Sequence, residues 1–198
     1  MGSEKIILID NGHGFNTKGK RSPDGRLQEW AWTREIATML VSALTANGFK
    51  AYLLVPEKTD ISLSERVRRA NQYCALHGRK NVLLISIHNN AAGADGQWHT
   101  ASGWCGYVAP NASQESMRLA QTLYAEASAR GLQGNRNVPH CKYWVGDFYI
   151  LKRTQCLAVL TENLFQDNRT DVEWLLSSLG KQAIVQLHLE GIKKHLVE

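Results

Sequence analysis

The stretch "NVLLISI" at residues 81–87 is the part of the sequence that most constrains the fold. It is apolar almost throughout, and such a run is typical of a strand at the centre of a parallel sheet that is covered on both faces. It is far shorter than the ~20 residues that a membrane-spanning helix needs. We therefore expect residues 81–87 to form a buried central strand.

Strand and helix patterns alternate on both sides of this run. Short apolar runs predict further strands at 5–10, 49–55, 104–109, 148–152 and 157–162. Apolar residues at helical spacing predict helices at 29–46, 62–76, 113–131, 171–179 and 181–196. The second of these helices opens with a Ser-x-x-Glu capping box, Ser62 to Glu65. Repeated strand–helix units without a linker predict an α/β fold in a single domain over residues 1–198, with a mostly parallel central sheet flanked by helices on both faces.

The composition is that of an ordinary globular protein. The chain has 198 residues, of which 43% are hydrophobic and 21% charged, so it can bury a sizeable core. Its net charge of +5 favours anionic partners, but the basic residues are dispersed, so we expect no nucleic-acid partner. We also expect no insertion into a membrane and a monomeric protein.

Two features bear on the cellular compartment. The first predicted strand begins within about five residues of Met1, which leaves no room for a signal peptide and does not reveal an export route. The chain has four cysteines and no Cys-x-x-Cys pair, which argues against a cysteine zinc site or a redox motif. We expect buried thiols, with a disulfide possible if the protein is exported.

Polar residues gather where the predicted strands end. The first strand runs into His13, the central strand into His88 and the last strand into Glu162, while Glu29 opens the first helix. In open α/β sheets, ligand sites form beyond the carboxyl ends of the strands. Two imidazoles and one carboxylate can hold a catalytic zinc ion with one position open for water, and the remaining glutamate would then serve as the base.

Each of these residues also has a purely structural interpretation. The helix dipole favours Glu29 in a first helical turn without any ligand. His88 could be a buried histidine bonded to a carbonyl group, Glu162 could belong to an ion pair, and Asn11-Gly12 is a common turn signal that could account for His13. The spacing of the four residues leaves both interpretations open.

Five ordered motifs make the chain similar to a known family. They are "IDNGHG" at 9–14, "EWAWTREIA" at 29–37, "RVRRAN" at 66–71, "SIHNNA" at 86–91 and "VLTENLFQDN" at 159–168. In this order they resemble the zinc-dependent N-acetylmuramoyl-L-alanine amidases of bacterial cell-wall remodelling and phage lysis. The sequence departs from the family pattern at Asn11, where proline is usual, at Leu157, where proline is frequent, and at Leu164, where glycine is preferred.

The resemblance implies a site and a reaction. One zinc ion per chain would be bound by His13, Glu29 and His88, and a zinc-activated water would attack the carbonyl with Glu162 as general base and acid. The bond cut would join N-acetylmuramic acid to L-alanine in peptidoglycan, so that residues 1–198 would be one catalytic amidase domain acting at the bacterial cell wall. A zinc peptidase of the stem peptide and a non-catalytic wall-binding module are the alternatives.

Residues around these four are candidates for secondary roles. For substrate contacts we expect Asn90, Arg136, Trp104 and Trp144, although the three last side chains could equally pack their loops. Asp10 could accept a hydrogen bond from an imidazole N–H, or cap the turn that follows it. The sequence does not distinguish a host remodelling enzyme from a phage lysin.

Overall fold

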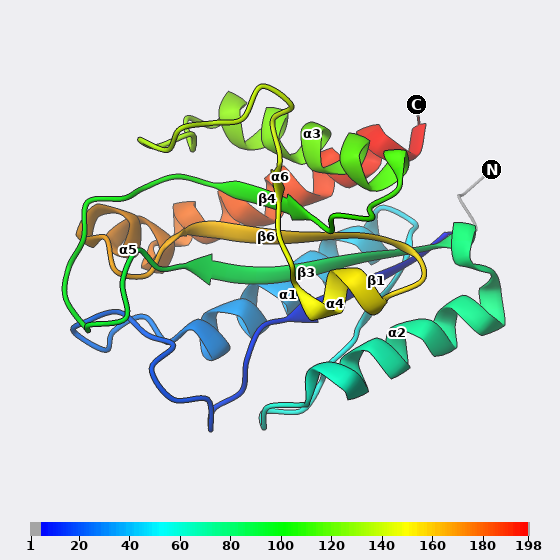
Figure 1. Ribbon diagram of the computed structural model, residues 1–198, viewed down its shortest axis with the longest axis horizontal. Coiled ribbons are helices and arrows are strands. Elements are labelled where there is room, and N and C mark those ends of the chain that lie inside the picture. Colours follow the sequence, from blue (N-terminus) through cyan, green and yellow to red (C-terminus); the bar gives the residue numbers. More distant parts are fainter. Residues whose placement is uncertain (1–4, 198) are drawn as a thin grey trace.

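The computed structural model describes residues 5–197 and has the expected α/β architecture (Figure 1). Its strands are β1 (Ile6–Asn11), β2 (Lys50–Leu53), β3 (Val82–Asn90), β4 (Cys105–Val108), β5 (Trp144–Val145) and β6 (Leu157–Phe165). Its helices are α1 (Glu29–Ala46), α2 (Leu63–His77), the 3₁₀ turn η1 (Arg79–Asn81), α3 (Gln114–Ala129), α4 (Tyr149–Arg153), α5 (Arg169–Leu176) and α6 (Ser178–Val197). The segment before Lys5, on which the expectation about a signal peptide rests, lies outside the described residues.

The six strands form one sheet in the order β2-β1-β3-β6-β4-β5. The pairs β1/β2, β1/β3 and β3/β6 are parallel, whereas β4 is antiparallel to β6. The predicted central strand, β3, is buried from Val82 to Ile87 and lies between β1 and β6. The mostly parallel sheet is therefore confirmed.

Alternate residues of the strands enter two separate cores, because successive side chains of a strand point to opposite faces. Ile7 and Ile9 of β1 pack with Ile85 of β3 in a core that includes side chains of α1, α3, α5 and α6. Ile6 and Leu8 pack with α2 and α4 on the opposite face. Helices thus cover both faces of the sheet, as Figure 1 shows. Among the described residues, no helix combines the length and apolar character needed to cross a membrane.

One predicted element is wrong and two are too short. Residues 148–152 were expected to form a strand, but the segment is the short helix α4, in which the neighbouring Ile150 and Leu151 are both buried against the face that carries α2. A strand would have directed these two side chains to opposite sides. The strands β3 and β6 both run three residues further than predicted, and these added residues form one end of the site described next.

Candidate active site

His13 follows β1 and has an unusual backbone conformation. Its φ is 62°, in the left-handed region that residues with a side chain rarely adopt. The two glycines beside it provide space rather than this conformation. A Cβ atom on Gly12 would lie 2.3 Å from Cε1 of His88, and one on Gly14 would lie 2.0 Å from the backbone nitrogen of Asp60. Only glycine therefore lets the chain pass between these neighbours.

A buried arginine from α2 holds this turn in place. Nη1 of Arg66 donates to Oδ1 of Asp10 at 2.6 Å and to the carbonyl oxygen of Asn11 at 2.7 Å, and Nη2 donates to the carbonyl oxygen of His13 at 3.3 Å. The second oxygen of Asp10 accepts from the hydroxyl of Ser86 at 2.5 Å. The hypothesis that Asp10 orients an imidazole is therefore wrong, because both of its carboxylate oxygens bind other groups.

Three of the predicted site residues converge on one point. Oε1 of Glu29, the first residue of α1, lies 3.4 Å from Nε2 of His13 and 3.0 Å from Nδ1 of His88, and it also accepts from the backbone N–H of Asn89 at 3.0 Å. The two imidazole rings are perpendicular, with their centroids 5.0 Å apart. One ligand atom from each of the three side chains lies within 4.8 Å of the others.

This group fits a zinc ion chemically. Two imidazoles and a carboxylate are a known ligand set for catalytic zinc with an open fourth position. Glu29 is only 1% exposed, yet its Oε2 has no hydrogen-bond partner among the described residues. A buried carboxylate oxygen without a partner is costly, and a cation would remove that cost.

The electrostatics of the group follow from its burial. Burial alone would raise the pKa of Glu29, but the hydrogen bonds from His13 and His88 outweigh it, so the pKa is lowered. Burial would lower the pKa of His88, but its hydrogen bond to Glu29 outweighs that effect and raises it. Glu29 is therefore a carboxylate in the folded protein, the form in which it can bind a metal.

Glu162 lies beside this group on the neighbouring strand. In the parallel register of β3 and β6 it is paired with His88, and its Oε2 is buried without a hydrogen-bond partner among the described residues. Burial raises the pKa of Glu162 to about 7; the charge of Glu29 adds to this effect, while His88, Lys20 and Arg136 oppose it. Its carboxyl group is thus placed to exchange a proton near neutral pH.

The residues that follow Glu162 explain one departure from the family motif. Leu164 has a φ of 62°, and the register between β3 and β6 shifts beyond His88 and Glu162. A left-handed residue favours glycine, which agrees with the preference of the family at this position. Here the leucine side chain is 4% exposed and packs in the core that includes α1, so its burial compensates the unfavourable backbone conformation.

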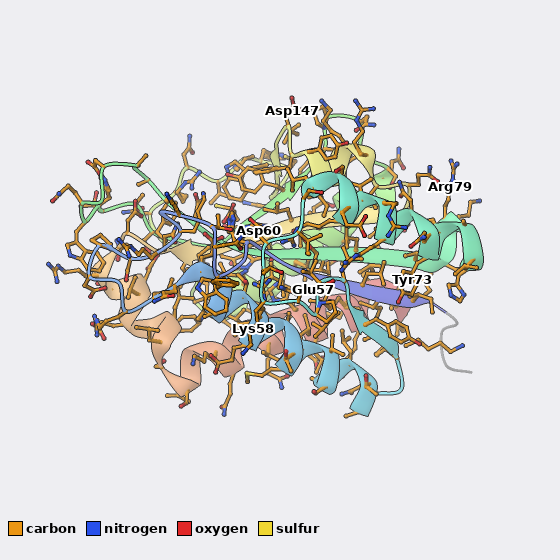
Figure 2. The ribbon with its side chains drawn as sticks, turned by 90° about the horizontal axis from the view of Figure 1, so that it is seen from below. Glu57, Lys58, Asp60, Tyr73, Arg79 and Asp147 are labelled. Carbon is orange, nitrogen blue, oxygen red and sulfur yellow. The ribbon has the colours of Figure 1, made fainter. Side chains whose placement is uncertain are left out.

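The four residues lie at a cavity of about 670 Å³. One wall is formed by Ile61, Ser62 and Leu63 at the start of α2, and the opposite wall by the segment of Phe148, Tyr149 and Ile150 at α4. Asp60, which also lines the cavity, lies on the loop between β2 and α2 with Glu57 and Lys58 (Figure 2). A pocket of this size can hold part of a large substrate.

The predicted substrate contacts have different positions. The guanidinium of Arg136 lies 5.8 Å from the ring of Trp144 and 5.2 Å from the ring of Phe165. Trp104 is fully buried, and its indole N–H donates to Oδ1 of Asn163 at 2.9 Å. Asn90 is half-buried at the end of β3, where its Oδ1 accepts from the N–H of Ala91. None of these four side chains is among the residues that line the cavity.

Several lining residues were missed from the sequence. Lys20, Phe148 and Tyr149 line the cavity, but they lie in or next to loops and no spacing pattern marks them. For Phe148 and Tyr149 the strand predicted over 148–152 concealed their role. The basic loop "KGKR" at 18–21 was the only available signal for Lys20, and charge alone does not place a residue in a site.

Comparison with known proteins gives the family. The family model described as N-acetylmuramoyl-L-alanine amidase matches residues 7–194. A sporulation-specific N-acetylmuramoyl-L-alanine amidase of Bacillus subtilis is 27% identical over 190 residues, which are 95% of this chain and 67% of that protein. An endolysin of Bacillus phage SPP1 is 26% identical over 198 residues, covering 97% of this chain and 66% of its own length.

Solved structures agree on the fold. The crystal structure of an N-acetylmuramoyl-L-alanine amidase from Clostridium difficile 630 superposes with a TM-score of 0.83 at 23% identity, covering 100% of this chain and 99% of the other. The fold and the polar site beyond the strand ends define an α/β hydrolytic domain. The chain belongs to the N-acetylmuramoyl-L-alanine amidase family and is a hydrolase.

Proposed function

We propose that the chain hydrolyses the amide bond between N-acetylmuramic acid and L-alanine of peptidoglycan with one zinc ion bound by His13, Glu29 and His88. The observation that carries the proposal is the convergence of these three side chains beside Glu162, at the edge of a cavity. The family model and the relatives with this activity in their names support the choice of bond. We further propose that residues 1–198 act as a single catalytic domain at the bacterial cell wall.

The protein groups have distinct tasks in this reaction. A zinc ion held by His13, Glu29 and His88 would supply Lewis-acid polarisation of the scissile carbonyl and would lower the pKa of water to about 7. Glu162 accepts the proton of the attacking water and then donates it to the departing amine of L-alanine. This second transfer matters because an amide nitrogen leaves poorly unless it is protonated. The lowered pKa of Glu29 keeps it ionised, the form in which it would bind the ion beside the two imidazoles.

The substrate extends beyond the reacting bond. Outside the lining of the cavity, the guanidinium of Arg136 lies over the rings of Trp144 and Phe165, and we propose that it meets a carboxylate of the stem peptide there. The ring of Trp144 stacks under that guanidinium and limits its movement. Asn90, next to the end of β3, can donate its amide to the same substrate. We assign Trp104 no contact with substrate, because its ring is enclosed in the core.

Defined muropeptides test the proposal. The zinc-loaded protein is incubated with a disaccharide-peptide, and the products are identified by mass spectrometry. Release of free disaccharide and an intact peptide supports the amidase. A shortened peptide still attached to the sugar would instead indicate a zinc peptidase, and an unchanged substrate that binds the protein would indicate a non-catalytic wall-binding module.

A further inference from the structure

Two cysteines meet at the end of the sheet away from the active site. Cys74 lies in the last turn of α2, and Cys156 directly precedes β6. Both side chains pack in the core that α2 and α4 share, and the two thiols are close enough for each to shift the pKa of the other. They are 82 positions apart in the sequence, so only the fold brings them together.

A side-chain amide fixes the backbone around this pair. The Nδ2 group of Asn71 donates to the carbonyl oxygen of Arg153 at 3.1 Å, and its Oδ1 accepts from the N–H of Gln155 at 2.9 Å. Asn71 and Cys74 are three residues apart on a helix and therefore share one face. The same face of α2 thus binds the segment that presents Cys156, which limits the movement needed for a covalent link.

We propose that Cys74 and Cys156 form a disulfide bond when the protein meets a small disulfide oxidant such as glutathione disulfide. One thiolate of the pair attacks one sulfur of the oxidant and releases one glutathione thiolate. The other thiolate then attacks the sulfur of its partner in the mixed disulfide and releases the second glutathione. Two protein thiols are oxidised by two electrons in total, the oxidant is reduced to two thiols, and the two protons are shared with solvent and the released thiolates.

The surroundings suit the first step. Cys156, but not Cys74, lines a hollow of about 570 Å³ that is also lined by the cationic side chains Lys5, Arg79 and Lys80 and by the carboxylate of Glu115. The three cations outnumber this carboxylate, and their charge matches the carboxylates of glutathione disulfide. Arg79 lies just beyond α2 (Figure 2), and the pKa of Cys74 is lowered by the hydrogen bond from Cys156 and by the charge of Arg79. A thiol with a lowered pKa is the better nucleophile at neutral pH.

The other two cysteines lack these features. Cys105 is fully buried in β4, and burial raises the pKa of its thiol to about 12. The thiol of Cys141 donates to the carbonyl oxygen of Tyr143 at 3.3 Å in the long loop before β5. Cys141 is half-buried, so it provides a matched control for an accessible thiol.

The bond would link two segments whose neighbouring parts form walls of the catalytic cavity. The first turn of α2 and the segment at α4 form two walls of that cavity, and the pair joins the last turn of α2 to the segment that follows α4. Closing a loop of about 80 residues restricts the unfolded chain strongly. We expect the thermal midpoint to rise by about 5–10 °C on oxidation.

The test counts thiols and maps the link. Wild-type protein is treated with glutathione disulfide, denatured, and titrated with a thiol reagent, and its unreduced peptides are analysed by mass spectrometry. We expect the number of thiols to fall from four to two, with the Cys74 peptide joined to the Cys156 peptide. Persistence of all four thiols, a link through another cysteine, or glutathione adducts without a link would overturn the proposal.

Variants separate the pair from its neighbours. Cys141→Ser should still form the link and show the same rise in thermal midpoint, whereas Cys74→Ser and Cys156→Ser should show neither. If a serine variant at the pair does not fold, the peptide map of the wild-type protein decides alone. None of these readouts depends on amidase activity, so the proposal and the proposed function can fail separately.

Discussion

Arg66 donates a hydrogen bond from Nη2 to the backbone carbonyl of His13, 53 positions earlier in the chain. This contact explains how His13 keeps a φ of 62° without being glycine. The guanidinium also binds the carboxylate of Asp10 and the carbonyl of Asn11, so it fixes three residues of the turn at once. Arg66 is 2% exposed and is also among the residues that line the cavity, so it supports the turn from within the wall of the site.

Replacement of Arg66 should therefore weaken metal binding without removing a ligand. We expect Arg66→Lys to lower zinc affinity about 10–100-fold, because lysine cannot span all of these acceptors, and to lower stability by about 1–3 kcal/mol, because some of these buried acceptors lose their donor. Competition with a chelator measures the affinity, and chemical denaturation measures the stability. Arg68→Lys, on the exposed face of α2, is the control. Unchanged zinc affinity in the Arg66 variant would show that the turn at His13 keeps its conformation without this side chain.

Gly12→Ala should disturb the site by a steric route. The added methyl group would meet the imidazole of His88 at 2.3 Å, so the ring must leave its present position. We expect zinc affinity to fall at least about 10-fold. Gly48→Ala also costs backbone strain, since Gly48 has a φ of 83°, but its Cβ would meet nothing within 4 Å. Equal zinc affinity in the two variants would contradict the steric argument.

Glu162→Gln should lower the rate of hydrolysis without lowering the zinc content. Glutamine keeps the size of the side chain but cannot accept the proton of the attacking water, so we expect turnover to fall by about 10²–10⁴-fold. Zinc content, measured by elemental analysis, should stay near one per chain. His88→Ala should instead lose the metal. Retained turnover in Glu162→Gln would refute the proposed role of this residue.

His188 should make the stability depend on pH. It is fully buried in α6, its Nε2 lies 3.0 Å from the hydroxyl of Thr161, and burial lowers its pKa from 6.5 to about 4. Between these pH values the unfolded chain binds more protons at this histidine than the folded protein, so the contribution of His188 to stability rises with pH. The raised pKa of Glu162 has the opposite effect on stability over much of this window. Full stabilisation is present above about pH 6.5, and about 3 kcal/mol of it is lost as the pH falls to 4.

Denaturant titrations at several pH values check this prediction. His188→Gln removes the titrating group and should make the slope of stability against pH between pH 4 and 6.5 less positive than in the wild-type protein. His77→Gln changes an exposed histidine at the end of α2 and should leave the dependence as it is. An unchanged slope in His188→Gln would contradict the assignment to His188.

The sequence by itself determined the class of fold and singled out four polar residues that the structure brings to one cavity. The apolar run of β3, the helical spacing of α1 and the capping box of α2 are local patterns, and the local physics of strands and helices is enough to interpret them. The hydroxyl of Ser62 indeed accepts from the N–H of Glu65 at 3.2 Å. His13, Glu29, His88 and Glu162 stand out because each one lies where an apolar strand ends or a helix begins.

Only the tertiary structure decided how these side chains meet. That Glu29 binds both imidazoles, that Arg66 rather than a glycine supports the turn at His13, and that Trp104 is enclosed in the core all depend on contacts between residues far apart in the chain. The same holds for α4. Its apolar residues are compatible with a strand, but in the fold they pack together against α2 as a helix. Local patterns carry no information about such partners, because burial and hydrogen bonding are set by whichever segments the fold brings into contact.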